Sequence, residues 1–95
     1  MIAGTTKSGF QFEVPVGIGN DFRIVEAIAN ADSGDESERL RGIVDLVRLL
    51  LGDDGKKALY KHLTETCGSV PTDRVIEEVT EILKLARERS REVKN

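Results

Sequence analysis

One short stretch of this chain has the period of a β-strand, and it constrains the fold more than any other feature. In the stretch TTKSGFQFEVP near the start of the chain, Phe10, Phe12 and Val14 alternate with polar residues. The preceding Lys7–Gly9 segment has the composition of a tight turn. We therefore expect a β-hairpin over residues 3–14. A two-stranded ribbon is not stable alone in water, so the rest of the chain must cover its apolar face.

Helical periodicity governs the rest of the chain. Apolar residues recur at three- and four-residue spacing in four segments, which are residues 21–31, 36–51, 54–66 and 72–92. Gly52 stands where a helix would end, and Pro71 stands where the last helix would begin. The polar end over 87–95 is expected to fray. We expect a single domain over 1–95 of the α+β class, mainly α, in which four helices pack with the hairpin.

The core must consist mainly of Leu, Ile and Val, because the chain has three Phe, one Tyr and no Trp. The inward stripe of the first helix is predicted to be Phe22, Val25, Ile28 and Ala29, with a contribution from Ile24. Six further side chains are expected to be nearly inaccessible, namely Leu40, Val44, Val47, Leu51, Val79 and Leu83. Gly42 inside the second helical segment costs about 1 kcal/mol relative to Ala, which is tolerable where another backbone packs closely against it.

The charge distribution argues against nucleic acid as the main partner. The formal net charge is −3, whereas phosphate binding requires a basic surface. The acids are concentrated in residues 1–36, which carry two bases against six acids. No apolar run approaches about 20 residues, so no membrane span is expected. The single Cys67 fits a reducing compartment, and without a recognisable leader we expect a cytoplasmic product.

No pattern in the sequence predicts an enzyme, a cofactor or a metal site. His62 and Cys67 are five residues apart, with no third residue to orient them, so we expect a solvated histidine and a small apolar filler. The glycines of GIGNDF lack the third glycine and the βαβ unit of a dinucleotide site. The acidic stretch DSGDESE fails the calcium-loop pattern, because Ser37 and Ile43 occupy its sixth and twelfth positions.

An ordered set of blocks resembles a known group of proteins. The blocks are TTKSGFQFEVP, EAIANADSGD, LVRLLLGDDGKKALYKHL and GSVPTDRVIEEVTEIL, and the resemblance covers about residues 5–85. The set is similar to the small phage and prophage tail assembly chaperones of siphovirus-type phages, which have long non-contractile tails. The resemblance implies a non-enzymatic protein that keeps the tape-measure protein soluble while the tail tube assembles. It also implies action in the host bacterial cytoplasm and absence from the mature virion.

The resemblance carries no residue-level binding map, so the candidate partner-binding residues come from the sequence itself. Phe10 and Phe12 either cover the helical core or face a partner. The basic end of the chain, with Arg87, Arg89 and Arg91, either complements the helix dipole or binds an acidic partner. Besides the tape-measure protein, the partners considered are the major tail protein and a second copy of this chain.

A small DNA-binding regulator of the helix-turn-helix type is the alternative interpretation. The second and third helical segments, 36–51 and 54–66, would form the motif. The turn between them is acidic, with Asp53 and Asp54 where phosphates would lie. The third segment offers only lysines as candidate base-contacting residues, namely Lys56, Lys57 and Lys61. The sequence therefore favours the chaperone.

Overall fold

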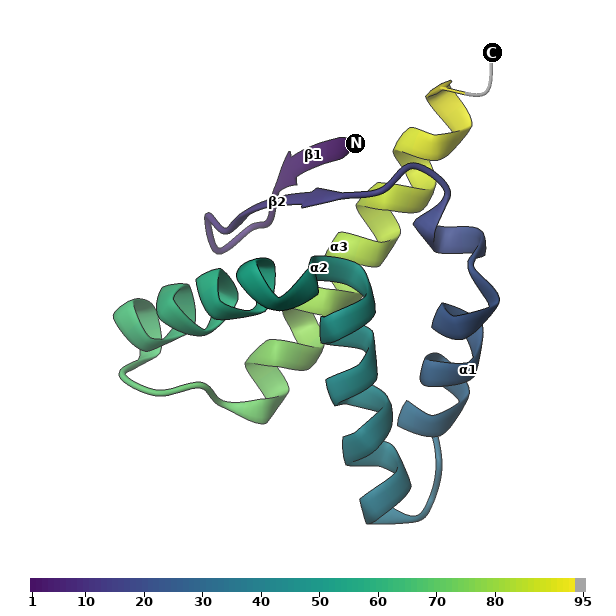
Figure 1. Ribbon diagram of the computed structural model, residues 1–95. Coiled ribbons are helices and arrows are strands. Elements are labelled where there is room, and N and C mark those ends of the chain that lie inside the picture. Colours follow the sequence, from purple (N-terminus) through teal and green to yellow (C-terminus); the bar gives the residue numbers. More distant parts are fainter. Residues whose placement is uncertain (94–95) are drawn as a thin grey trace.

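The computed structural model describes the backbone of residues 1–93 and the side chains of residues 1–89. In chain order its elements are β1 (Ile2–Thr5), β2 (Gln11–Val14), the 3-10 helix η1 (Ile18–Asn20), α1 (Phe22–Ala31), α2 (Glu36–Cys67) and α3 (Thr72–Val93). β1 and β2 pair antiparallel, with Ile2 opposite Val14 and Gly4 opposite Phe12. An N-terminal hairpin followed by helices confirms the expected fold class (Figure 1).

α2 is one bent helix where the sequence predicted two. Inside it, Gly52 has φ 70° and ψ −178°, a backbone conformation that is essentially restricted to glycine. The first arm (36–51) and the second arm (53–67) leave this residue in different directions (Figure 1). The expectation of four helices is therefore wrong, and the described chain has three α-helices. Gly52 was expected to end a helix, and its non-helical backbone does interrupt the helix between the two arms, which are joined there by a kink.

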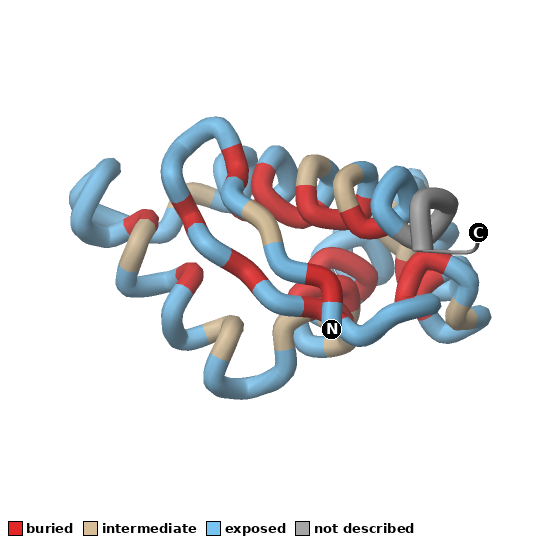
Figure 2. Tube along the Cα trace, turned by 90° about the horizontal axis from the view of Figure 1, so that it is seen from above, coloured by how far each residue is buried: buried red, intermediate tan, exposed pale blue. Residues whose placement is uncertain are grey.

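The hairpin lies across the helices with one face on the core (Figure 2). β1 runs beside α3, and β2 runs beside α2. Phe10 and Phe12 are each 5% exposed, so the prediction that they attach the hairpin to the helices is confirmed. The Phe12 ring also covers Gly4 on the paired strand, where an added Cβ would lie 2.8 Å from the ring Cζ. A side chain at this position of β1 would displace the ring.

The two arms of α2 and the inner face of α3 complete the core. Its largest fully buried side chains are Ile24, Leu50, Leu59, Leu63, Ile82, Val14 and Val47. Val47, Val79 and Leu83 are buried as expected. The prediction is wrong for Leu40 and Val44, which are 42% and 45% exposed, and Leu51 is half-buried. These three share a side of the first arm that is turned away from α1, because α1 packs at Gly42.

α1 is rotated relative to the predicted orientation. Ile24 and Ala27 are its buried residues, whereas Phe22 and Val25 are 77% and 45% exposed. Of the other two predicted residues, Ile28 is half-buried against the core and Ala29 is exposed. The stripe of α1 that faces inward therefore begins at Ile24 and not at Phe22.

The close contact at Gly42 explains this rotation. A Cβ at Gly42 would lie 2.4 Å from the backbone nitrogen of Ala31 and 2.7 Å from the carbonyl oxygen of Ala27. Backbones this close hold α1 in one rotational setting against the first arm of α2. The expectation that a neighbouring backbone packs against Gly42 is confirmed.

The C-terminal end of the described chain is more helical than the sequence predicted. α3 remains helical to Val93, past the point at which fraying was expected, and residues 94–95 lie outside the described part. Asp21 caps α1 by accepting a hydrogen bond from the Arg23 N–H at 2.9 Å. In the part of the chain that the structure describes, no helix has both the length and the apolar character needed to cross a bilayer.

Candidate functional site

Four polar side chains fasten the tip of the hairpin to two helices. Thr6 and Ser8 both donate hydrogen bonds to Oε1 of Glu78 on α3, at 2.8 and 3.0 Å. Ser8 Oγ also lies 3.0 Å from Nε2 of His62 on the second arm of α2. Glu78 is only 6% exposed, so these hydroxyl groups solvate a buried side chain. We call Thr6, Ser8, His62 and Glu78 the hairpin clasp.

The clasp contains a serine, a histidine and a carboxylate, but its hydrogen bonds do not activate a nucleophile. In a catalytic triad the imidazole accepts the serine proton, and the carboxylate orients the other ring nitrogen. Here the Ser8 hydroxyl donates to Glu78, and the direction of its 3.0 Å contact with His62 Nε2 depends on the imidazole tautomer. The carboxylate orients the hydroxyl groups instead of the imidazole. This geometry joins the hairpin to the helices.

The structure separates the two residues that were considered as a thiol–imidazole pair. His62 is half-buried and packs on Phe10, with ring centroids 5.6 Å apart, so it is not simply solvated. Cys67 is an exposed free cysteine at the end of α2, so the expectation of an apolar filler is wrong. Within the described residues, no group of three or more His, Cys, Asp or Glu side chains is placed to hold a metal ion.

Two side chains of α3 cover the outward edge of β1. Thr6 donates its N–H to the Phe10 carbonyl, so the backbone groups of alternate residues, including Ala3 and Lys7, point away from β2. Arg89 donates to the Ala3 carbonyl, and the Lys7 N–H donates to Glu81 Oε2 at 2.9 Å. The basic side chain of Arg89 therefore binds a backbone carbonyl, and the acidic side chain of Glu81 binds a backbone N–H.

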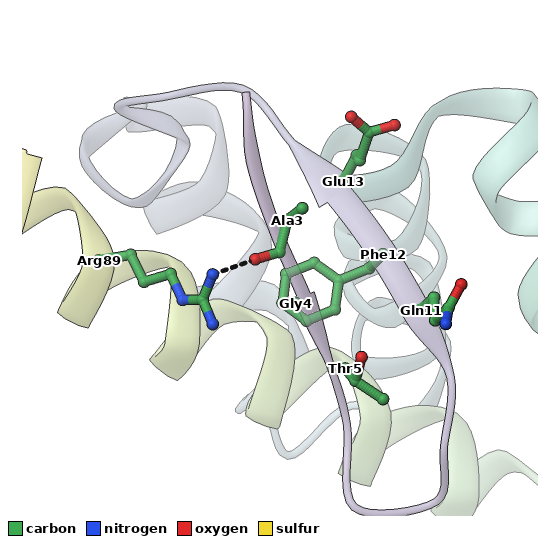
Figure 3. A pocket seen from close by; sticks show the side chains of 7 residues that line it. All are labelled: Ala3, Gly4, Thr5, Gln11, Phe12, Glu13 and Arg89. Carbon is green, nitrogen blue, oxygen red and sulfur yellow. Dashed lines mark hydrogen bonds between the residues drawn. The ribbon is translucent and has the colours of Figure 1, made fainter.

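The outer face of the hairpin forms an open hollow of about 760 Å³ (Figure 3). It is lined by Ala3, Gly4, Thr5, Gln11, Phe12, Glu13 and Arg89. Two of the predicted partner-binding residues, Phe12 and Arg89, therefore meet at one place. The Arg89 guanidinium reaches in from α3 toward the Ala3 carbonyl, and Glu13 lies on the far strand. The hollow presents both signs of charge, so it does not select an anion or a cation.

The five predicted partner-binding residues have different environments. Phe10 and Phe12 belong to the hydrophobic core, which leaves little of either ring for a partner in this structure. Arg87 lies over η1, where a Cβ on Gly19 would be 2.7 Å from its Cγ. Arg89 is bonded to the hairpin. A partner-binding role for Arg87 and Arg89 stays a prediction, and the Arg91 side chain lies outside the described residues.

The sequence-based prediction missed a row of exposed apolar side chains on α1. Seven of the ten residues of FRIVEAIANA are apolar, and its polar residues Arg23, Glu26 and Asn30 form one row. A helix that is apolar over more than half of its circumference needs cover on more than one side. The high apolar content of this segment was the sequence feature from which the exposed row could have been predicted.

No protein-family model matches this chain, and neither the curated proteins nor the solved structures include a significantly similar one.

Proposed function

We propose that this protein is a non-enzymatic phage tail assembly chaperone that binds the tape-measure protein and keeps it soluble while the tail tube forms. The ordered resemblance of four sequence blocks supports the family. The observation that carries the binding role is the exposure of large apolar side chains around a completed core: Phe22 is 77% exposed, and Val25, Leu40 and Val44 are between 42% and 45% exposed.

These apolar groups suit a helical client. They occur at helical spacing, with Phe22 and Val25 three residues apart on α1 and Leu40 and Val44 four apart on α2. Amphipathic helices bind other helices through side chains spaced in this way. A long client that carries many such helices would bind many copies of a small chaperone along its length.

The helix-turn-helix alternative gains no support from the geometry. The segment expected to be its turn is the Gly52 bend inside α2, and the exposed Asp53 and Asp54 follow that bend directly. Phosphates approaching the bend would meet two carboxylates. A gel-shift assay against genomic DNA fragments should therefore show no complex at physiological salt.

Co-expression tests the proposal directly. A tape-measure protein, sought as a long helical open reading frame immediately downstream of this gene, is produced alone and together with this chain, and its soluble fraction and co-purification are measured. We expect the client to stay soluble and to co-purify only when this chain is present. If the client's solubility is unchanged and no complex forms, the proposal is wrong.

A further inference from the structure

α1 has an apolar row that nothing in the described chain covers. Phe22, Val25 and Ala29 lie at positions i, i+3 and i+7 of a helix and therefore on one face, and all three are exposed. We call these three residues the α1 outer stripe. In Figure 1, α1 lies at the edge of the molecule, with the first arm of α2 on one side of it and no described element on the other.

The charges beside the α1 outer stripe are acidic. With 3.6 residues per turn, Glu26 falls beside Phe22, and Asp32 at the end of the helix falls beside Val25. The one base on this helix, Arg23, is bonded to Asp21 at 2.6 Å. Lys7 is the only other base in residues 1–36, and it lies in the hairpin turn. Arg48 of α2 lines a hollow together with Glu26 and Arg23, but it lies 4.0 Å from Asp45. Each of these two arginines thus has an aspartate partner, and the groups beside the apolar side chains carry an excess of carboxylates.

We propose that the α1 outer stripe is a docking surface for an amphipathic helix whose apolar face is flanked by Lys or Arg. Apolar anchors would pack on Phe22 and Val25, and the flanking cations would pair with Glu26 and Asp32. The inference rests on the proposed function in one respect, namely that the partner is a helical client. It assigns the docking surface on this chain and the charge of the client helix that binds there.

The same charges argue against other occupants. A second copy that docked through its own α1 would place Glu26 and Asp32 against identical acids. The basic end of a second copy has the right charge, but past Ala86 its sequence RERSREV offers a single apolar residue. An anionic lipid surface would be repelled by the acids that flank the stripe. A basic amphipathic helix satisfies both the apolar and the electrostatic requirement.

The test uses the full chain and three variants. Phe22→Ser/Val25→Ser removes the stripe, and Glu26→Lys reverses its charge. Val70→Ser/Ile76→Ser is the matched control, since these two side chains are 37% and 40% exposed, close to Val25, but lie in the turn before α3 and near the start of that helix. The probes are two synthetic helical peptides with the same Leu stripe, flanked in one by Lys and in the other by Glu. Binding is followed by fluorescence anisotropy, and thermal unfolding verifies that each variant is folded.

We expect the wild type to prefer the Lys-flanked peptide, and Phe22→Ser/Val25→Ser to bind it about tenfold or more weakly, as when central anchors are truncated. Glu26→Lys should weaken that binding, and Val70→Ser/Ile76→Ser should leave it unchanged. If Phe22→Ser/Val25→Ser binds the Lys-flanked peptide as tightly as the wild type does, the inference is overturned. It is also overturned if the wild type prefers the Glu-flanked peptide.

The co-expression assay distinguishes this inference from the proposed function. If the wild type and Phe22→Ser/Val25→Ser retain the tape-measure protein equally, the docking surface is wrong and the chaperone function stands. If the wild type binds the Lys-flanked peptide through the stripe but does not keep the client soluble, the chaperone function is wrong and the docking surface stands.

Discussion

Gly42 of α2 lies so close to α1 that a Cβ atom on it would stand 2.4 Å from the backbone nitrogen of Ala31. Two helix backbones approach each other at this point without intervening side chains. The nearest atoms belong to backbone and not to the flexible end of a side chain, so neither helix can yield locally. The position of α1 on α2 therefore depends on the absence of one methyl group.

Gly42→Ala should destabilise the protein although alanine is the better helix former. The gain in helix propensity is about 1 kcal/mol, whereas forcing atoms into a packed contact typically costs about 1–3 kcal/mol. Contact with rigid backbone places this case at the upper end of that range. Urea unfolding measures the change, and Gly34→Ala is the control, because nothing lies within 4 Å of a Cβ there. An unfolding midpoint for Gly42→Ala at or above that of the wild type would contradict the close contact.

Thr6→Val should loosen the hairpin clasp. Valine has nearly the same shape as threonine but removes one of the two hydroxyl groups that donate to the buried Glu78. A buried polar group that loses a partner costs about 1–3 kcal/mol. Thermal unfolding should show a lower midpoint for Thr6→Val, while the exposed neighbour Thr5→Val should stay within about 0.5 kcal/mol of wild type. Equal midpoints for the two variants would mean that the clasp contributes nothing to stability.

The cap of α1 should survive mild acid. The side-chain hydrogen bond from Arg23, helped by the Arg23 backbone N–H, lowers the pKa of Asp21 from 3.8 to about 2. Because the folded-state pKa is below the ordinary value, the stabilisation is complete above pH 3.8 and is lost as the pH falls through about 2. An NMR titration of the Asp21 carboxyl group should show a midpoint of about 2, and Arg23→Gln should raise it. An unchanged midpoint in Arg23→Gln would assign the shift to the backbone N–H.

Arg89→Ala should loosen β1 against β2. Without the guanidinium, the outward carbonyl of Ala3 loses its partner on α3, and the amides of Gly4 and Thr6 that face β2 should exchange with solvent faster. Hydrogen exchange measured by NMR tests this, with Lys84→Ala, an exposed change on the same helix, as the control. Equal exchange rates of the Gly4 and Thr6 amides in Arg89→Ala and Lys84→Ala would contradict this prediction.

The hairpin and the positions of the helices were largely predictable from local pattern. The alternation at Phe10 and Phe12 located β2, and the spacing of apolar residues located α1 within residues 21–31. The bend at Gly52 was not predictable as such, because a glycine at a helix end and a glycine inside a bent helix look alike in sequence. Only packing on both arms decides between them.

The inward face of each helix was harder to predict than its existence. On α1, apolar residues occupy so much of the circumference that periodicity did not distinguish Ile24 from Phe22 as the inward residue. The contact at Gly42 selects one orientation, and it is a tertiary effect. The hairpin clasp could not be predicted from the sequence either, because Thr6 and Glu78 are 72 residues apart and neither belongs to a recognisable motif.

The bonds between the hairpin and α3 also constrain when the protein can fold during its synthesis. The first strand leaves the ribosome long before its partners, since Arg89 follows Ala3 by 86 residues and Glu81 follows Lys7 by 74. Until α3 emerges, Phe10 and Phe12 have only part of the surface that covers them in the finished domain. A nascent chain arrested before Thr72 therefore carries an incompletely covered aromatic ribbon, the kind of exposed hydrophobic segment that makes folding intermediates prone to aggregate.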